Sequence, residues 1–153
     1  MGSPCARATL VVLATDEQAV KSVLTAGYEA DYQECDKTGA IVSFYWDARL
    51  RGELESEGAL RDMRIPYDFI VENDMEIEAQ ETYFRHIDGQ AFYRFYFTAD
   101  SGKIEIDDLK LVLDDHAKLT EMIRLKDEHF TVPPIECQMR YSAIPSHYQP
   151  VKA

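Results

Sequence analysis

Cysteine is scarce in this sequence, and no long apolar run occurs in it. The chain has 3 Cys among 153 residues, at Cys5, Cys35 and Cys137, and no two of them form a CxxC pair. A small secreted disulfide scaffold has a denser and even number of cysteines, so we expect reduced thiols and a cytoplasmic protein. The apolar stretch near the N-terminus, ATLVVLA at 8–14, is too short for a signal peptide or a membrane span.

Basic residues are also few. The sequence has 16 Lys and Arg against 28 Asp and Glu, which gives a formal net charge of −12. Because such a field repels phosphates and anionic lipids, we expect no direct binding to nucleic acid and none to membranes. The same field attracts cationic surfaces. The alternative is that the high net charge only keeps the protein in solution.

Motifs for catalysis and for cofactors are missing. The sequence contains no Walker loop and no GxGxxG, GxSxG, HExxH or EF-hand pattern. The four His include no i,i+4 pair, and neither Cys35 nor Cys137 has a base at a spacing typical of a nucleophile. We therefore predict no catalytic residue, no metal ligand and no cofactor, which favours a non-enzymatic role.

What the sequence does contain is the pattern of one folded α+β domain. Of its residues 46% are hydrophobic, and only 7 are Gly and 6 are Pro, which indicates a single domain over 1–153 with a tail from about 142. Apolar or alternating runs predict strands, and stripes at helical spacing predict helices. Short turns between neighbouring strands favour a mostly antiparallel sheet with two or three helices packed on one face. The expected strands are 8–14, 28–34, 40–46, 81–87, 90–98, 103–106 and 135–141, and the expected helices are 15–27, 52–63 and 107–129.

Three local signals predict where the chain turns and where helices end. Aromatic runs flank Asp88-Gly89 in ETYFRHIDGQAFYRFYFT (81–98), and this dipeptide allows the positive φ angles of a tight hairpin. Asp114-Asp115 is expected to divide the long helix in two, because Asp is a poor residue for a helix interior. Thr15 and Gln18 have the spacing of a capping box for the first helix, which we expect to end at Gly27.

The most regular charge pattern is ENDMEIEAQE at 72–81. It places Glu72, Asp74, Glu76 and Glu78 at every second position. In an extended segment these four acids share one face, at intervals of about 6.6 Å. A short helix over 74–80, capped by Asn73, is the alternative. In both cases the acids face outward, because burying four unpaired charges is too costly.

Two further acidic clusters lie at the start of the second helix and around the third. If all three clusters lie on one side of the molecule, they form an anionic face that could occupy the phosphate-binding groove of a basic protein. The alternative is that acids at helix starts stabilise helix dipoles and that the others keep the surface hydrated. The predicted partner-binding residues are Glu72, Asp74, Glu76, Glu78, Glu53, Glu55, Glu57, Asp107, Asp108, Asp114 and Asp115.

LRDMRIPYDF (60–69), the acids that follow it and YFRHIDG (83–89) together resemble small accessory proteins carried by bacterial plasmids and phages. The likeness covers residues 60–95 and includes no diagnostic motif. It implies an origin in a mobile element. Compact acidic proteins of such elements often block host defence or regulatory proteins, as anti-restriction and anti-CRISPR inhibitors do. No functional residue is transferred by this resemblance.

We therefore expect a non-enzymatic acidic protein, a nucleic-acid mimic that binds and blocks a basic, nucleic-acid-binding host protein. Two alternatives remain open. One is a small metal-dependent or ligand-binding enzyme that uses the carboxylates of Asp107 and Asp108 near His116. The other is an oligomeric structural module, such as a homodimer that pairs through the aromatic hairpin at 81–98.

Overall fold

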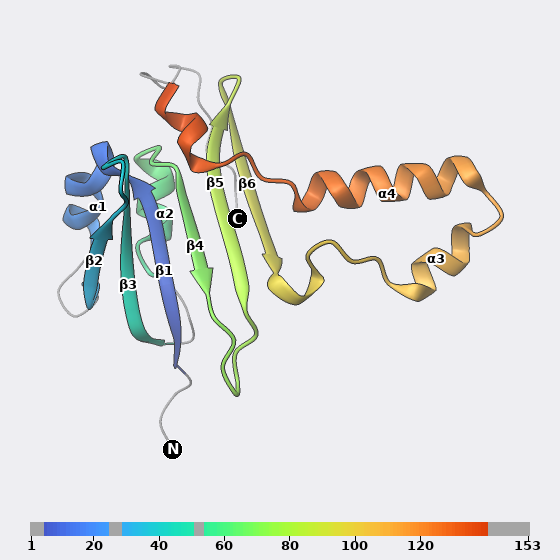
Figure 1. The fold of residues 1–153 in the computed structure, drawn as a ribbon, viewed down its shortest axis with the longest axis horizontal. Helices are drawn as coiled ribbons and strands as arrows, with labels where there is room; N and C mark the ends of the chain where they lie inside the picture. The colour runs from blue at the N-terminus through green and yellow to red at the C-terminus, as the bar shows by residue number, and fades with distance from the viewer. Residues whose placement is uncertain (1–4, 25–28, 51–53, 141–153) are drawn as a thin grey trace.

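Six antiparallel strands form one sheet in the order β2-β3-β1-β4-β5-β6 (Figure 1). The structure, a computed structural model, describes residues 5–24, 29–50 and 54–140. The first strand of the chain, β1, lies inside the sheet, between β3 and β4. Therefore β2 and β3 lie on one side of β1, and β4, β5 and β6 lie on the other. The strands are β1 (Cys5–Leu13), β2 (Tyr32–Cys35), β3 (Ile41–Leu50), β4 (Tyr67–Val71), β5 (Gln80–Ile87) and β6 (Gln90–Phe97).

Two short helices, α1 (Glu17–Val23) and α2 (Glu57–Asp62), cover one face of the sheet. Each contributes a fully buried apolar side chain, Val20 from α1 and Leu60 from α2. These pack among alternate residues of the central strands, such as Leu10 and Val12 of β1, because successive side chains of a strand point to opposite faces. The sheet with its helices confirms the α+β class predicted from the sequence.

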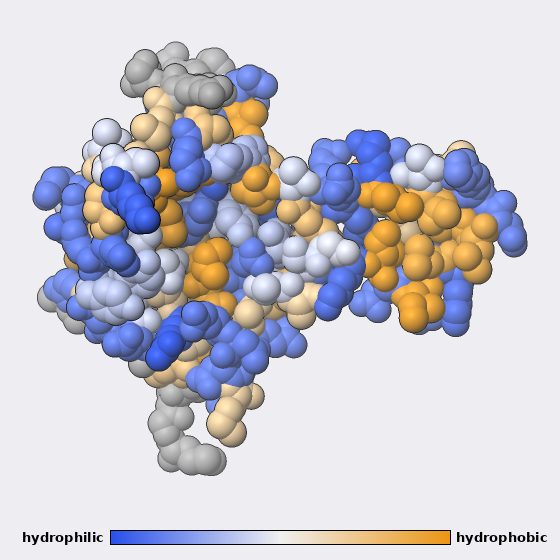
Figure 2. Space-filling view, in the orientation of Figure 1, coloured by the Kyte–Doolittle hydropathy of each residue, from blue (hydrophilic) through white to orange (hydrophobic). Residues whose placement is uncertain are grey.

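The other two helices do not join this layer. α3 (Ile106–Val112) and α4 (His116–Phe130) pack against each other, and neither contains a buried residue. They form an arm, residues 106–130, that extends past β6 and away from the sheet (Figures 1 and 2). The predicted break in the helix at Asp114-Asp115 is confirmed. Asp115 is the N-cap of α4, and its carboxylate accepts the Lys118 N–H at 3.1 Å.

The hairpin predicted at Asp88-Gly89 is confirmed. Both residues have positive φ angles, 51° and 76°, and Ile87 pairs with Gln90 across the turn. A turn of two residues that both have φ above zero matches the right-handed twist of the flanking strands, which sets the register of the whole β5–β6 pair. The turn at 36–39 also forms as predicted, and there Gly39 has a φ of 74°.

Three predicted elements are wrong. Residues 72–79 are neither a strand nor a helix but a loop between β4 and β5, because the chain reverses there. Residues 103–106 form no strand, and Ile106 instead begins α3. Residues 135–140 alternate as a strand would, but they form a 3-10 helix, η3 (Ile135–Arg140). β5, against which η3 packs, has β4 and β6 as neighbours, so only its last residues beyond Phe84 have an open edge, which is too short for another strand of this length.

Several predicted boundaries also differ. The first helix is entered through a 3-10 turn, η1 (Ala14–Asp16), and neither end of this turn has the side-chain hydrogen bond of a capping box. β2 is shorter than 28–34, and α2 begins at Glu57 where a start near 52 was expected. The predicted helix stop at Gly27 and the predicted tail from about 142 lie outside the described residues.

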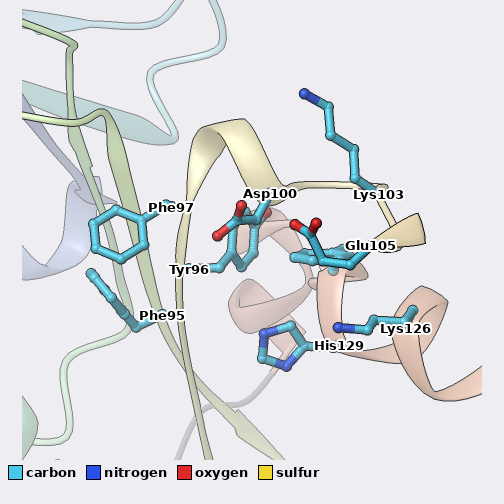
Figure 3. Close-up of a pocket in the computed structure, with 9 residues that line it drawn as sticks. Phe95, Tyr96, Phe97, Asp100, Lys103, Glu105, Lys126 and His129 are labelled. Carbon is cyan, nitrogen blue, oxygen red and sulfur yellow. The ribbon is translucent and has the colours of Figure 1, made fainter. Parts of the chain in front are cut away.

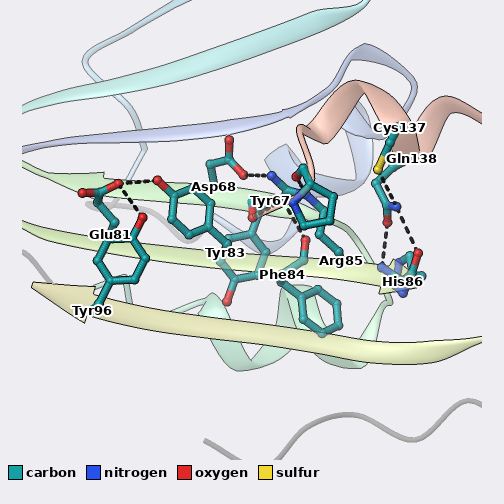
Figure 4. A network of polar contacts seen from close by, with 11 residues as sticks. Tyr67, Asp68, Glu81, Tyr83, Phe84, Arg85, His86, Tyr96, Cys137 and Gln138 are labelled. Carbon is teal, nitrogen blue, oxygen red and sulfur yellow. Dashed lines mark hydrogen bonds and ion pairs between the residues drawn. The ribbon is translucent and has the colours of Figure 1, made fainter. Parts of the chain in front are cut away.

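Arg85 fastens the chain that follows the arm onto the open face of the sheet, which is the face opposite α1 and α2. Its guanidinium is 1% exposed and pairs with the carboxylate of Asp68 on β4 (Figure 4). It also donates hydrogen bonds to three carbonyl oxygens, those of Pro133 at 2.9 Å, Tyr67 at 3.0 Å and Phe84 at 2.9 Å. Burial raises the pKa of the Asp68 carboxyl, and the charge of Arg85 opposes that rise.

Gln138 of η3 makes a second attachment, to His86, which is the residue after Arg85 on β5. β4 starts at Tyr67 opposite Phe84, so His86 on β5 extends beyond the end of β4. The Gln138 side chain takes the place of the missing strand. Its oxygen accepts the His86 N–H at 2.7 Å, and its amide donates to the His86 carbonyl at 3.0 Å (Figure 4). The end of the arm is therefore held by buried polar contacts.

Replacing Arg85 by Ala is expected to lower the free energy of unfolding by about 3–5 kcal/mol, because the Asp68 carboxylate would stay buried without its partner. Urea-induced unfolding at pH 7 measures this loss. Arg124→Ala is the matched control, since Arg124 forms its ion pairs at the surface of α4 and its removal should change stability little. Equal losses of unfolding free energy in the two variants would contradict the stabilising role assigned to the buried ion pair and hydrogen bonds of Arg85.

His86 provides a second test of the core. Its ring meets that of Phe84 edge-on at a centroid distance of 5.4 Å, and its Nε2–H donates to the Arg64 carbonyl at 2.6 Å. Burial lowers the pKa of His86 from its ordinary value near 6.5, so the folded protein holds a neutral imidazole. Below about pH 6.5 the unfolded chain takes up this proton before the folded chain does. The contribution of His86 to stability is therefore complete above that pH and is lost as the pH falls.

In the His86→Leu variant, we expect a smaller difference between the melting temperatures at pH 7.5 and pH 5.5 than in the wild type. Thermal unfolding followed by circular dichroism at the two pH values measures it. His116→Gln changes an exposed His at the start of α4 and should keep the wild-type pH dependence. If His86→Leu keeps it too, His86 is not the group that titrates.

Candidate functional site

The four carboxylates of Glu72, Asp74, Glu76 and Glu78 lie on the β4–β5 loop, at the lower end of the sheet in Figure 1. All four are exposed, as predicted for either conformation. They do not form a straight row, because the N–H of Asp74 donates to the Ile77 carbonyl at 2.8 Å and the chain turns there. The turn buries the Ile77 side chain to 8% exposure, and this fixes the loop against the core.

Antiparallel pairing brings further acids to this end of the sheet. β1 begins here, where β3 and β4 end, so Arg7 and Asp47 come next to the start of the loop. Arg7, Asp47, Glu72 and Asp74 line one hollow of about 380 Å³. Asp31, just before β2, is tied to the same group, because its carboxylate accepts the Asp47 N–H at 2.6 Å.

We call this group of side chains the acidic end. It unites residues that are more than 40 positions apart in the sequence, and each of them is exposed to solvent. None of them forms an ion pair with a basic side chain that the structure describes. The acidic end consists of Asp31, Asp47, Glu72, Asp74, Glu76 and Glu78.

Sequence reasoning missed Asp31 and Asp47. Asp31 lies within the predicted strand 28–34, and Asp47 directly follows the predicted strand 40–46. A charged side chain is rarely buried, so the sequence signals that both are exposed. It does not signal the order of strands in the sheet, and only that order places them beside the loop.

In the second predicted cluster, the carboxylate of Glu57 is paired. Glu57 forms an ion pair with Arg61 at 3.1 Å and accepts a hydrogen bond from the Tyr67 hydroxyl at 2.5 Å. Burial and the nearby Glu57 charge raise the pKa of the Tyr67 phenol, so this hydroxyl keeps its proton and remains a donor. Glu55 is exposed, and Glu53 lies outside the described residues.

The third predicted cluster lies on the arm, apart from the acidic end (Figure 1). Asp107 approaches Lys110 at 3.9 Å, and Asp115, the N-cap of α4, approaches Lys118 at 4.0 Å. The two remaining members, Asp108 and Asp114, lie beside them in the sequence. The three predicted clusters therefore do not form one continuous face, and the loop cluster is the one that gains further acids.

A second hollow of about 380 Å³ lies at the root of the arm, between the end of β6 and α4 (Figure 3). Tyr96 meets Phe130 edge-on there, at a centroid distance of 5.1 Å. Burial and the nearby positive charges of Arg94 and Lys126 lower the pKa of His129, so this imidazole is mainly neutral near pH 7. The hollow thus combines aromatic rings and a neutral imidazole with two acids and two lysines, whose formal charges balance. These charged residues are Asp100, Glu105, Lys103 and Lys126.

Neither the root of the arm nor the acidic end provides a metal centre. Within residues 5–24, 29–50 and 54–140, no three His, Cys, Asp or Glu are placed to hold a metal ion together. This includes Asp107, Asp108 and His116, the carboxylates and His that the sequence offered for an enzyme. In the same ranges, no helix combines the length and apolar character needed to cross a membrane.

Comparisons with family models, with curated proteins and with solved structures found no match. The functional conclusion therefore depends on the chemistry of the acidic end and the arm.

Neutralising the loop tests whether its acids repel one another. We expect the loop variant, which combines Glu72→Gln, Asp74→Asn, Glu76→Gln and Glu78→Gln, to melt about 2–4 °C higher than the wild type at low salt. The gain should shrink in 0.5 M NaCl, where charges more than a few ångströms apart are screened.

The matched control is the arm variant, which combines Asp107→Asn, Asp108→Asn, Asp114→Asn and Asp115→Asn. It should gain no stability, because Asp107 and Asp115 approach lysines and Asp108 lies in the first turn of α3, where acids are favourable. Equal, salt-independent shifts in both variants would show that the acids of the loop are not in mutual repulsion.

Proposed function

We propose that this protein is a non-enzymatic interaction protein whose acidic end binds and blocks a basic, nucleic-acid-binding protein. The observation that carries the proposal is the meeting of Asp47 with Glu72 and Asp74 at one hollow, with Asp31 bonded to the Asp47 backbone and no ion pair to a described basic side chain. Six exposed carboxylates at one end of a chain of net charge −12 produce a directed negative field. Such a field steers a cationic partner to that end.

The acidic end resembles the backbone of nucleic acid in charge. Duplex DNA has about one negative charge per 1.7 Å of axis, and its binding proteins neutralise these charges with Lys and Arg. Arginine forms paired hydrogen bonds with carboxylates as it does with phosphates. The carboxylates of Glu72 and Asp74 and of the neighbouring strand ends could therefore occupy the phosphate positions of a basic groove, which would exclude the nucleic acid.

The loop is held in place before any partner binds. The Glu72 N–H donates to the Arg7 carbonyl at 2.9 Å, and Ile77 anchors the far side of the turn in the core. A preformed loop loses little conformational entropy on binding, so more of its electrostatic attraction contributes to affinity. Met75, at the tip, is 99% exposed and could make the first apolar contact with the groove.

A bacterial cytoplasmic setting fits this proposal. The resemblance of residues 60–95 to accessory proteins of plasmids and phages is in keeping with a blocker of host defence proteins, such as restriction or CRISPR nucleases. These enzymes hold DNA in basic grooves. The proposed chemistry requires only that the partner has such a groove, whichever element encodes the blocker.

The test captures basic proteins on the immobilised wild type, loop variant and arm variant. The probe is the fraction of a bacterial lysate that binds heparin, applied at 50 mM NaCl. We expect the wild type to retain proteins that are released by 300 mM NaCl and by competing duplex DNA, because both screen or replace the carboxylate contacts.

The loop variant should retain less than about a tenth of what the wild type retains, and the arm variant should match the wild type. Although both variants remove four charges, only the loop variant weakens the acidic end. If the two variants lost capture equally, net charge alone would explain binding. If retention were unchanged by salt or by DNA, blocking through a phosphate-binding groove would be wrong.

A further inference from the structure

The arm exposes more apolar surface than its place in a small protein explains. Its exposed fractions are 68% for Ile106, 84% for Leu111, 66% for Leu113, 50% for Ile123 and 52% for Leu125. Figure 2 shows apolar residues gathered on the side of the arm that faces the viewer, across both helices. A monomeric soluble protein rarely exposes a contiguous apolar patch of more than a few hundred Å², and larger patches mark interaction sites.

The charges of α4 indicate which partner fits. Although the chain carries −12, this helix is neutral, because its three basic and three acidic residues balance. Arg124 lies between Glu121 at 2.7 Å and Glu128 at 2.8 Å, so the charges are also paired in space. A helix that docks on a basic partner would be expected to carry a surplus of acids. The six charged residues are Lys118, Glu121, Arg124, Lys126, Asp127 and Glu128.

Neutrality matters most for an approach between two like chains. Two copies of a protein of charge −12 repel each other at most orientations, and least where the local charge is zero. Ile123 and Leu125 lie on this neutral helix, whereas Ile106, Leu111 and Leu113 lie beside acids of α3 and of the turn after it. The repulsion between two arms is therefore smallest along α4, and the exposed apolar side chains of both helices supply the attraction.

The available area agrees with a dimer. Five aliphatic side chains exposed by 50–84% supply roughly 500 Å² of apolar surface in each copy. Two copies together reach the roughly 1,000 Å² that a specific interface needs, before polar rim atoms are counted. α4, with 15 residues, is about 22 Å long, which is enough for three turns to face a partner helix.

We propose that the protein is a homodimer in which the α3–α4 arms of two copies pack together about a two-fold axis as a four-helix interface. In such an interface the same patch serves both copies, so no second complementary surface is required. Pairs of antiparallel helices commonly bury their apolar sides in this way. The dimer carries two acidic ends, and since these lie on the sheet and not on the arm, it does not depend on the proposed partner binding.

The test measures solution mass against concentration, from 1 to 200 µM, by sedimentation equilibrium. We expect the wild type to pass from a monomer of 17.6 kDa toward twice that mass. The combined variant Leu111→Asp and Leu125→Asp should raise the dimer dissociation constant at least 100-fold. The uncharged variant Leu111→Gln and Leu125→Gln should raise it as well, which separates lost apolar contact from added repulsion. Circular dichroism confirms that each variant folds.

Met75→Asp is the matched control, because Met75 is as exposed as the arm residues but lies on the β4–β5 loop. It should leave the dissociation constant within twofold of the wild type. Dimerisation should also persist in 0.5 M NaCl, whereas capture through the acidic end should not.

A wild type that stays monomeric to 200 µM would overturn the proposal. So would a dimer that survives both arm variants, or one that is dissociated only by Phe95→Ser at the exposed edge of β6. That last result would place the contact on the aromatic hairpin.

Discussion

Antiparallel pairing around a central first strand is the constraint on which the acidic end depends. Because β1 pairs with β3 on one side and β4 on the other, the ends of both neighbours come together where β1 begins. Asp47, in the last part of β3, and Glu72, directly after β4, are thereby brought to one hollow, although they lie far apart in the chain. The charge pattern that matters is a property of strand order, and a parallel arrangement would have separated these residues.

A buried guanidinium sets the position of the arm. Arg85 binds carbonyl oxygens of β4 and β5 and of the segment that follows α4, and Gln138 completes the contact beyond the end of β4. The far end of the arm is therefore tied to the open face of the sheet, while its near end leaves from β6. The arm leaves the sheet between these two roots, and no residue of α3 or α4 is buried.

Local chemistry made much of the fold predictable. Asp88-Gly89 requires a tight hairpin, and Asp115 prefers a helix N-cap to a helix interior, so both features were found from the sequence. Alternation alone was less informative. The acids of 72–78 and the run at 135–140 both have strand periodicity, yet one is a loop and the other a 3-10 helix, because tertiary contacts decide whether an alternating segment finds a strand partner. The site was predictable only in its loop; Asp31 and Asp47 needed the strand order.

The central claim is that negative potential is concentrated at the acidic end. NMR measures this directly in the free protein, by comparing how a cationic and a neutral nitroxide in solution speed the relaxation of each amide proton. The difference between the relaxation enhancements by the cationic and by the neutral nitroxide reports the local negative potential. The account predicts that this difference is largest at residues 72–78 and at Asp31 and Asp47, and smaller along α4. A uniform difference over the surface, or a maximum on the arm, would contradict it.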